Sequence, residues 1–207
     1  MSVRHRLVLG IDGAGKSTLL DSLNKKDGTL TMEPTSSDTA REFKARMSSL
    51  DITSDLIAER KAIYLDLNKT FDERVRETLQ AGSAVATTGN ALVTMVSHSL
   101  MNEIVSGSEG EVAESVSDWV QSSESLKPDQ LVLVHAPDQV IRQRIEARQL
   151  EGQADEKFWG FNSPYFLSRY QETWHAIIGE LLAASDISRV SLSSVDLSPS
   201  EMLQQLQ

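Results

Sequence analysis

The 207-residue sequence lacks cysteine, a long apolar run and a positive charge balance. The missing cysteines exclude a disulfide framework and a thiolate metal site. The formal net charge of -10 argues against a broad nucleic-acid-binding surface, which needs clustered Lys and Arg, although it leaves a local basic cleft open. No apolar run approaches membrane-spanning length, and no signal peptide precedes the first apolar segment. We therefore expect a cytoplasmic protein without a membrane partner.

The length and the 40% apolar content allow one substantial core, so we expect a single domain over residues 1–207. Apolar runs predict strands at residues 7–9 and 131–134, and a β-prone stretch predicts a third at 83–88. Two further short strands are expected at residues 29–32 and 188–192. Helical patterns occupy residues 21–28, 53–80, 91–105, part of 106–129, 138–148, 165–184 and 199–206. This alternation predicts an α/β fold, a doubly wound and mainly parallel five-stranded sheet flanked by helices.

Residues 10–18, with the sequence GIDGAGKST, fit the phosphate-binding pattern of Gly, four residues and Gly-Lys-Ser/Thr. A strand before the motif and a helical stripe after it provide the context that such a loop needs. The glycines let the backbone approach a polyphosphate with its N–H groups pointing inward. The residues expected to bind ATP are Gly10, Gly13, Ala14, Gly15, Lys16, Ser17 and Thr18.

Two side chains of this loop have expected roles in chemistry. Lys16 would bridge the terminal phosphates as a point charge, and Ser17 would offer its hydroxyl to Mg²⁺. The positive end of the following helix would face the anion. The loop thus predicts a P-loop that binds a nucleoside triphosphate together with Mg²⁺.

Glu33 stands at the carboxyl end of the second expected strand, followed by Pro34. Ligands of α/β folds bind at this edge, so Glu33 is a candidate general base, hydrogen-bond partner or outer-shell magnesium contact. A solvated turn residue is the other interpretation. The third strand ends without the Asp that often helps to hold Mg²⁺, and Thr87, Thr88 and Asn90 stand there instead.

Arginines recur along residues 138–148, and a loop rich in aromatic and charged residues follows. A subset of Arg142, Arg144 and Arg148 would reach a phosphoryl group, or they lie on the surface paired with acidic residues. Residues 149–164 have the composition of a closing lid, or of a loop anchored by its aromatics. His98 is expected to be a packed side chain, and residues 59–61 a solvated charge cluster.

The order of these motifs resembles the thymidylate kinase family over nearly the whole chain. The matching segments are GIDGAGKST at 10–18, Glu33-Pro34, LIAERKA at 56–62, LVLVHAPDQVIRQRIEAR at 131–148 and VSLSSVDLSPSEMLQQL at 190–206. The resemblance implies transfer of the terminal phosphoryl group of ATP to a deoxynucleotide, with Mg²⁺. The family often forms dimers through long helices, so residues 53–80 are a candidate homodimer surface.

The resemblance also implies roles for single residues. Asp12 would face the acceptor sugar or a metal-bound water, and Arg60 would approach the acceptor base. Arg144, Arg148 and Lys157 would neutralise charge from the lid side, where positioned positive charge is the main catalytic effect. Glu33, Arg60 and Asn90 are the expected acceptor-binding residues.

Three departures from the family fall on the acceptor side. Thr88-Gly89-Asn90 replaces an Asp-Arg pair, Met32 replaces an arginine, and Leu56 replaces a base-stacking aromatic. An acceptor hydroxyl needs a base and less phosphate-gripping charge, and Glu33-Pro34 also resembles the Glu-Pro of deoxynucleoside kinases. The alternatives are therefore a kinase of a deoxynucleoside, a kinase of a 5-hydroxymethyl pyrimidine in DNA, and a non-catalytic nucleotide-binding module.

Overall fold

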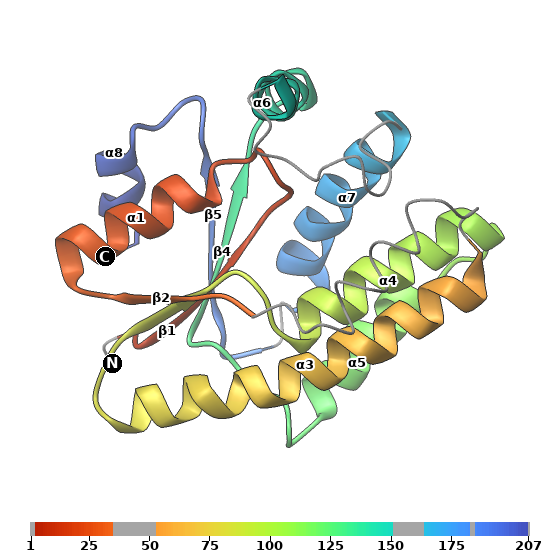
Figure 1. The fold of residues 1–207 in the computed structure, drawn as a ribbon, viewed down its shortest axis with the longest axis horizontal. Coiled ribbons are helices and arrows are strands. Elements are labelled where there is room, and N and C mark those ends of the chain that lie inside the picture. The colour runs from red at the N-terminus through yellow and green to blue at the C-terminus, as the bar shows by residue number, and fades with distance from the viewer. Residues whose placement is uncertain (1–2, 35–52, 151–163, 183–184, 207) are drawn as a thin grey trace. The chain divides into compact units, whose positions relative to one another are not determined.

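Figure 1 shows the computed structural model, which describes residues 3–34, 53–150, 164–182 and 185–206. The chain divides into two compact units. The first unit comprises Met1–Thr31, Ser83–Thr87 and Pro128–Gln207, and the second comprises Met32–Gly82 and Thr88–Lys127. The single domain expected over residues 1–207 stays a prediction. Within the described part of the chain, no helix is both long and apolar enough to cross a membrane.

The first unit is built on a five-stranded sheet with the order β2-β3-β1-β4-β5. Its strands are β1 (His5–Leu9), β2 (Leu30–Met32), β3 (Val85–Thr87), β4 (Gln130–His135) and β5 (Ser188–Ser193). β1 pairs in parallel with β3 and β4, and β4 pairs in parallel with β5. Each strand overlaps one of the predicted strands, and the predicted α/β fold is confirmed.

Helices flank this sheet. They are α1 (Lys16–Asp27), α6 (Asp138–Leu150), α7 (Pro164–Ala176) and α8 (Pro199–Gln204). α7 continues into a π-helical turn, η1 (Ile177–Leu181), where the sequence predicts one uninterrupted helix. The predicted start of α8 is confirmed, because Ser198 and Glu201 form a reciprocal capping box.

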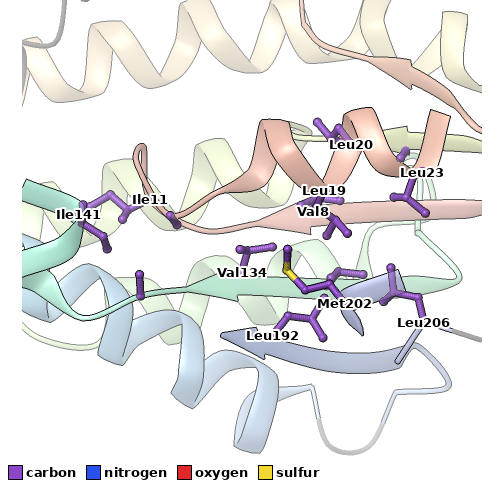
Figure 2. Packing of buried hydrophobic residues seen from close by; sticks show 14 of the residues in the cluster. Val8, Ile11, Leu19, Leu20, Leu23, Val134, Ile141, Leu192, Met202 and Leu206 are labelled. Carbon is purple, nitrogen blue, oxygen red and sulfur yellow. The ribbon is translucent and has the colours of Figure 1, made fainter. Parts of the chain in front are cut away.

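One face of the sheet is buried by α1 and α8 (Figure 2). Val8, Val134 and Leu192 come from three strands and share a hydrophobic cluster with Leu19 of α1 and with Leu206, which follows the end of α8. None of the five is more than 4% exposed. Burial of each such side chain contributes about 1.5–3 kcal/mol. This cluster holds β1 against α1, and it thereby fixes both ends of the loop that joins them.

The second unit contains three helices, α3 (Ser54–Gln80), α4 (Ala91–Ser106) and α5 (Glu111–Gln121). α4 contacts both α3 and α5. Between α3 and α4, Asn68 Nδ2 donates a buried hydrogen bond of 2.7 Å to Thr94 Oγ1. Trp119 of α5 is 1% exposed and anchors this helix in the second unit. A homodimer through α3 stays a prediction.

Candidate functional site

The loop between β1 and α1 has the backbone geometry of an anion-binding loop. Gly10, Gly13 and Gly15 have φ of +138°, +84° and +107°, values that side chains disfavour. α1 starts after Gly15 without a side-chain cap, so no described side chain accepts from the N–H groups of its first turn. Those groups and the positive end of the helix favour a bound anion with several oxygen atoms.

Gly10 is the position in this loop with the least space. A Cβ atom there would lie 2.3 Å from the carbonyl oxygen of Val134. We expect Gly10→Ala to lower the free energy of unfolding by more than about 3 kcal/mol, or to prevent folding, because the backbone strain and the clash add. Gly28→Ala is the matched control, since Gly28 has φ +64° and open space around it.

The control substitution should cost only about 1–2 kcal/mol of left-handed strain. Urea unfolding of both variants measures the difference. Equal losses would show that the contact with Val134 does not matter.

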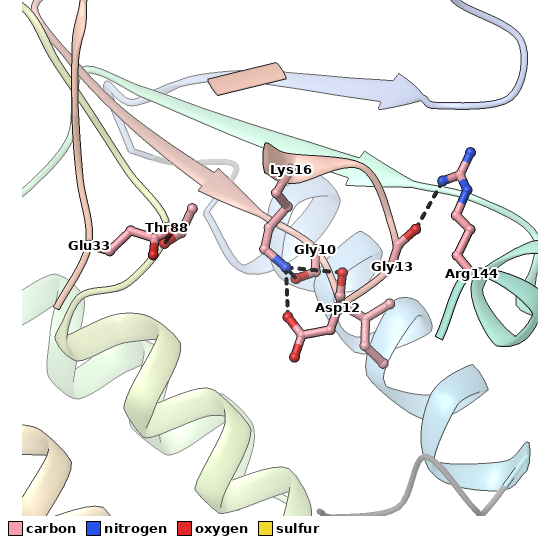
Figure 3. Close-up of polar contacts among 8 residues, drawn as sticks. Gly10, Asp12, Gly13, Lys16, Glu33, Thr88 and Arg144 are labelled. Carbon is pink, nitrogen blue, oxygen red and sulfur yellow. Dashed lines mark hydrogen bonds and ion pairs between the residues drawn. The ribbon is translucent and has the colours of Figure 1, made fainter. Parts of the chain in front are cut away.

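Lys16 lies across the loop to which it belongs (Figure 3). Its Nζ donates to the carbonyl oxygens of Gly10 at 2.8 Å and Ile11 at 3.0 Å, and it forms an ion pair with Asp12 at 3.3 Å. The Asp12 side chain is 58% exposed, so this pair contributes little to stability. Lys16 can therefore exchange these oxygens for those of a phosphate at a small cost.

The other loop residues predicted from the motif divide into core and surface positions. Ala14 is fully buried in the core cluster and holds the loop in place. Ser17 and Thr18 are exposed in the first turn of α1. Magnesium keeps several water molecules and phosphate oxygens as ligands and needs few from the protein, so the Ser17 hydroxyl fits the predicted role.

Arg144 of α6 joins the loop to the turn after β5. Its Nη1 donates to the carbonyl oxygen of Gly13 and to Ser194 Oγ, both at 2.9 Å, and its Nη2 donates to the carbonyl oxygen of Ser194 at 3.4 Å. The sequence suggested a phosphate contact or a surface ion pair for this residue. The structure shows neutral acceptors on two loops in place of a surface ion pair, and Figure 3 shows the bond to Gly13. The phosphate contact of Arg144 stays a prediction.

Arg148 and Ser194 both lie near Arg144. Arg148, predicted as a second catalytic arginine, lies in the last turn of the same helix. Ser194 was not predicted, because a serine in a turn carries no pattern of its own. The predicted lid falls largely outside the described residues, and so does Lys157.

In the second unit, Glu33 accepts a hydrogen bond from Thr88 Oγ1 at 3.4 Å, drawn in Figure 3. Gly89 follows, and a Cβ atom there would lie 2.8 Å from Pro34 Cγ. Asn90 is 2% exposed and caps α4, accepting from the N–H of Val93 at 3.1 Å. The predicted acceptor side therefore consists of the exposed carboxylate of Glu33 and neutral residues. Among these, Gly89 has no space for a larger side chain.

Arg60 of α3 is held by α4 and is not part of a solvated cluster. It lies 4.7 Å from the centre of the Tyr64 ring, and its Nη1 is 3.2 Å from His98 Nε2. His98 Nδ1 lies 2.6 Å from the carbonyl oxygen of Thr94, so Nδ1 carries the proton and Nε2 accepts from Arg60.

Burial, assisted by the positive charge of Arg60, lowers the pKa of His98 to about 3. The packed His98 expected from the sequence is confirmed, since the residue is 3% exposed. Lys61 also contacts α4, donating to Ser99 Oγ at 3.3 Å. The prediction of a solvated cluster at residues 59–61 was therefore wrong for Arg60 and Lys61.

Comparison with solved structures shows proteins of similar fold. The deoxyadenosine kinase from M. mycoides with bound dATP is similar with a TM-score of 0.68 at 11% identity, over 98% of this chain and 97% of that chain. The thymidylate kinase from Candida albicans is similar with a TM-score of 0.64 at 16% identity, over 100% of this chain and 91% of that chain. No curated protein matches the sequence at a significant level.

The chain has the α/β fold of these two kinases and carries a phosphate-binding loop between β1 and α1. The family model described as an AAA domain matches residues 6–159, which is more than half of the chain. The chain therefore belongs to that family. Membership of the thymidylate kinase family in particular stays a prediction.

Proposed function

We propose that the protein transfers the γ-phosphoryl group of ATP to a hydroxyl group of a nucleoside. The observation that carries this choice is Asn90, which stands where the resemblance implies a phosphate-gripping arginine and is a neutral residue, 2% exposed, that caps α4. The neighbouring Gly89 has no space for a gripping side chain either, because Pro34 lies where its Cβ atom would stand. Thr88 and Asn90 on either side are also neutral.

The first unit supplies the residues for the donor. The loop N–H groups and Lys16 bind the phosphates of ATP, and Ser17 would hold Mg²⁺, which when bound neutralises charge on the phosphate oxygens. Lys16 leaves the carbonyl oxygens of Gly10 and Ile11 to contact the terminal phosphates. Catalysis on this side is electrostatic, because a loose phosphoryl transition state needs little covalent help.

The second unit supplies the residue for the acceptor. The acceptor oxygen forms a bond to the γ-phosphorus, the bond from that phosphorus to the β–γ bridging oxygen breaks, and ADP leaves. The proton of the hydroxyl goes to Glu33, whose carboxylate Thr88 orients by its hydrogen bond. A phosphate monoester acceptor is already ionised and would need no base, so the exposed Glu33 beside neutral residues favours the hydroxyl.

The test is transfer of radiolabelled γ-phosphate from ATP across a panel of acceptors. The panel holds deoxynucleosides, deoxynucleoside monophosphates, and DNA with and without 5-hydroxymethyl pyrimidines. We expect label in a deoxynucleoside monophosphate product. Label in a deoxynucleoside diphosphate would overturn the proposal in favour of the thymidylate-kinase-like reaction, and label in modified DNA would make the acceptor a polymer. No label anywhere would support a non-catalytic nucleotide-binding module.

Arg144 should act on ATP binding through the shape of the loop. We expect Arg144→Ala to raise the KM for ATP about tenfold with a smaller change in kcat, because loss of the bonds to Gly13 and Ser194 loosens the loop in both ground and transition states. Ser194→Ala should have a weaker effect of the same kind. Glu146→Ala, an exposed change on the same helix, is the control.

Initial rates at varied ATP concentration separate the two parameters. A fall in kcat at constant KM would contradict this role, since it would mean that Arg144 contacts the transferring phosphoryl group directly.

A further inference from the structure

A cavity of about 640 Å³ in the first unit is lined by two histidines that the proposed phosphoryl transfer does not use. Its walls come from the end of β4, the start of α6, one side of α7 and the turn after β5. His135 is the last residue of β4, and His175 lies in the last turn of α7. Their ring centres are 5.1 Å apart, and the planes meet at 68° in an edge-to-face contact. Two neutral imidazoles favour this contact, whereas two imidazolium cations would repel each other.

The charged groups around the His135 ring are acidic. Three elements bring carboxylates to the cavity: Asp138 from α6, Glu172 from α7 and Asp196 from the turn after β5. Among the described lining residues there is no lysine or arginine. On the side toward β1, the two histidines lie with uncharged residues, which include Gly10, Ile11, Tyr170 and Trp174. A positive charge on His135 would therefore be attracted to this cavity wall, not to the core.

Two of these neighbours act on His135 in opposite directions. Burial and then the charge of His175 lower the pKa of His135 from the ordinary 6.5, whereas the Asp196 carboxylate raises it. The ring is therefore neutral at neutral pH, the state in which it packs on His175. Because the folded pKa lies below 6.5, the unfolded chain binds the proton first. The neutral contact stabilises the fold fully above that pH, and its contribution falls as the pH drops toward the folded pKa.

The turn after β5 connects His135 with the phosphate loop. The carbonyl oxygen of His135 accepts a hydrogen bond from the N–H of Ser194 at 2.9 Å. Ser194 Oγ accepts from Arg144, which also donates to the carbonyl oxygen of Gly13. The turn lies directly against the loop as well, since a Cβ atom on Gly15 would be 3.1 Å from Ser194 Cβ. A displacement of Ser194 is therefore transmitted to the loop in two ways.

We propose that His135 is a proton-operated switch, whose neutral ring packs on His175 and whose protonated ring turns to Asp196 and shifts the turn that carries Ser194. The cavity leaves space for the imidazole to rotate without displacing core residues. Asp196 now accepts from Ser193 Oγ at 2.5 Å within the turn. A protonated imidazole competes for that carboxylate, so the hydrogen bonds inside the turn change with the proton.

The consequence for the phosphate loop rests on the proposed function, but the switch itself does not. Arg144 reaches Gly13 and Ser194 together while the ring is neutral and the turn stands as described. A shifted turn loosens this connection. We therefore expect acid pH to weaken the binding of ATP beyond the effect of protonating ATP itself.

The test follows the histidine rings and the backbone amides by NMR in labelled full-length protein, from about pH 8 to about pH 5. The chain has four histidines, so His135→Gln identifies the signal of His135. We expect the Ser194 amide signal to move with the same midpoint as that ring. His175→Gln should raise the midpoint toward 6.5, and Asp196→Asn should lower it and remove most of the Ser194 amide change.

Both variants change exposed side chains, so they should fold. Asp186→Asn is the matched control, because it removes the same charge as Asp196→Asn from an exposed position outside the cavity. It should leave the His135 midpoint and the Ser194 amide change as in the wild type. The proposal would be overturned by a midpoint that neither His175→Gln nor Asp196→Asn alters, or by a Ser194 amide that does not follow the ring.

Calorimetry with ATP tests the connection to the loop. The ratio of the Kd for ATP at acid pH to that at neutral pH should be at least about fivefold larger in the wild type than in His135→Gln, the lower end of usual couplings between sites. Titration of ATP itself cancels, because both proteins meet the same ligand. Equal ratios would overturn the connection to the loop. If neither protein binds ATP, the proposed function fails, and the NMR result still decides the switch.

Discussion

Replacing Lys16 by alanine should lower phosphoryl transfer by about 10²–10³-fold, the effect of removing one preorganised donor from a developing negative charge. The loop glycines and the start of α1 remain in the variant, so it should still fold. Lys16 is half-buried and bonded to Gly10 and Ile11, and both oxygens can be hydrated when the ammonium is lost. Steady-state transfer of labelled phosphate from ATP measures the effect.

Lys25→Ala is the matched control for this change. Lys25 is an exposed cation in the last turn of the same helix, so its replacement removes an equal charge far along α1 from the loop. Activity should stay within about twofold, as surface changes have small effects. A similar fall in both variants would mean that net charge, and not the position of Lys16, governs the rate.

Glu33→Gln should lower transfer to a hydroxyl acceptor by about 10²–10⁴-fold, the usual contribution of a general base. Glutamine keeps the size and can still accept the hydrogen bond from Thr88 Oγ1, but it cannot take a proton. The KM for ATP should be unchanged, because Glu33 belongs to the acceptor side. The same labelled-phosphate assay, run at varied ATP and varied nucleoside, measures both parameters.

Thr88→Val separates orientation from proton transfer. It removes the hydroxyl that donates to Glu33 and should lower kcat only a few fold, as expected for loss of one neutral hydrogen bond. Glu77→Gln, an exposed carboxylate on α3, should have no effect. Full activity in Glu33→Gln would remove the base from the mechanism and would favour an acceptor that is already ionised.

The central strand β4 could be predicted from the sequence because it contains a short apolar run. Leu131 to Val134 are four consecutive apolar residues, and the structure buries all of them on both faces of β4. The phosphate loop was predictable for a similar reason, since its glycines, Lys16 and Ser17 carry their geometry within nine residues. A pattern of neighbouring residues predicts a strand or a loop when those residues alone determine its backbone geometry.

The contacts that shape the candidate site could not be predicted, because their partners are far apart in the chain. Arg144 donates to Gly13 across 131 residues and to Ser194 across 50. Arg60 meets His98 across 38 residues, and its position within a charged run indicated solvent instead. Periodicity tells which face of a helix is apolar, but not which backbone oxygen a long side chain reaches.

The bonds of Arg144 also bear on the electrostatics of the loop. Its three acceptors among the described residues are two carbonyl oxygens and a hydroxyl, none of which carries a formal charge. A guanidinium held by a carboxylate would form a dipole whose field fades within a short distance. Held by neutral oxygens, it remains a monopole whose attraction reaches an approaching polyphosphate. The residue that fastens the loop thereby also draws anions toward it, in a protein whose overall charge repels them.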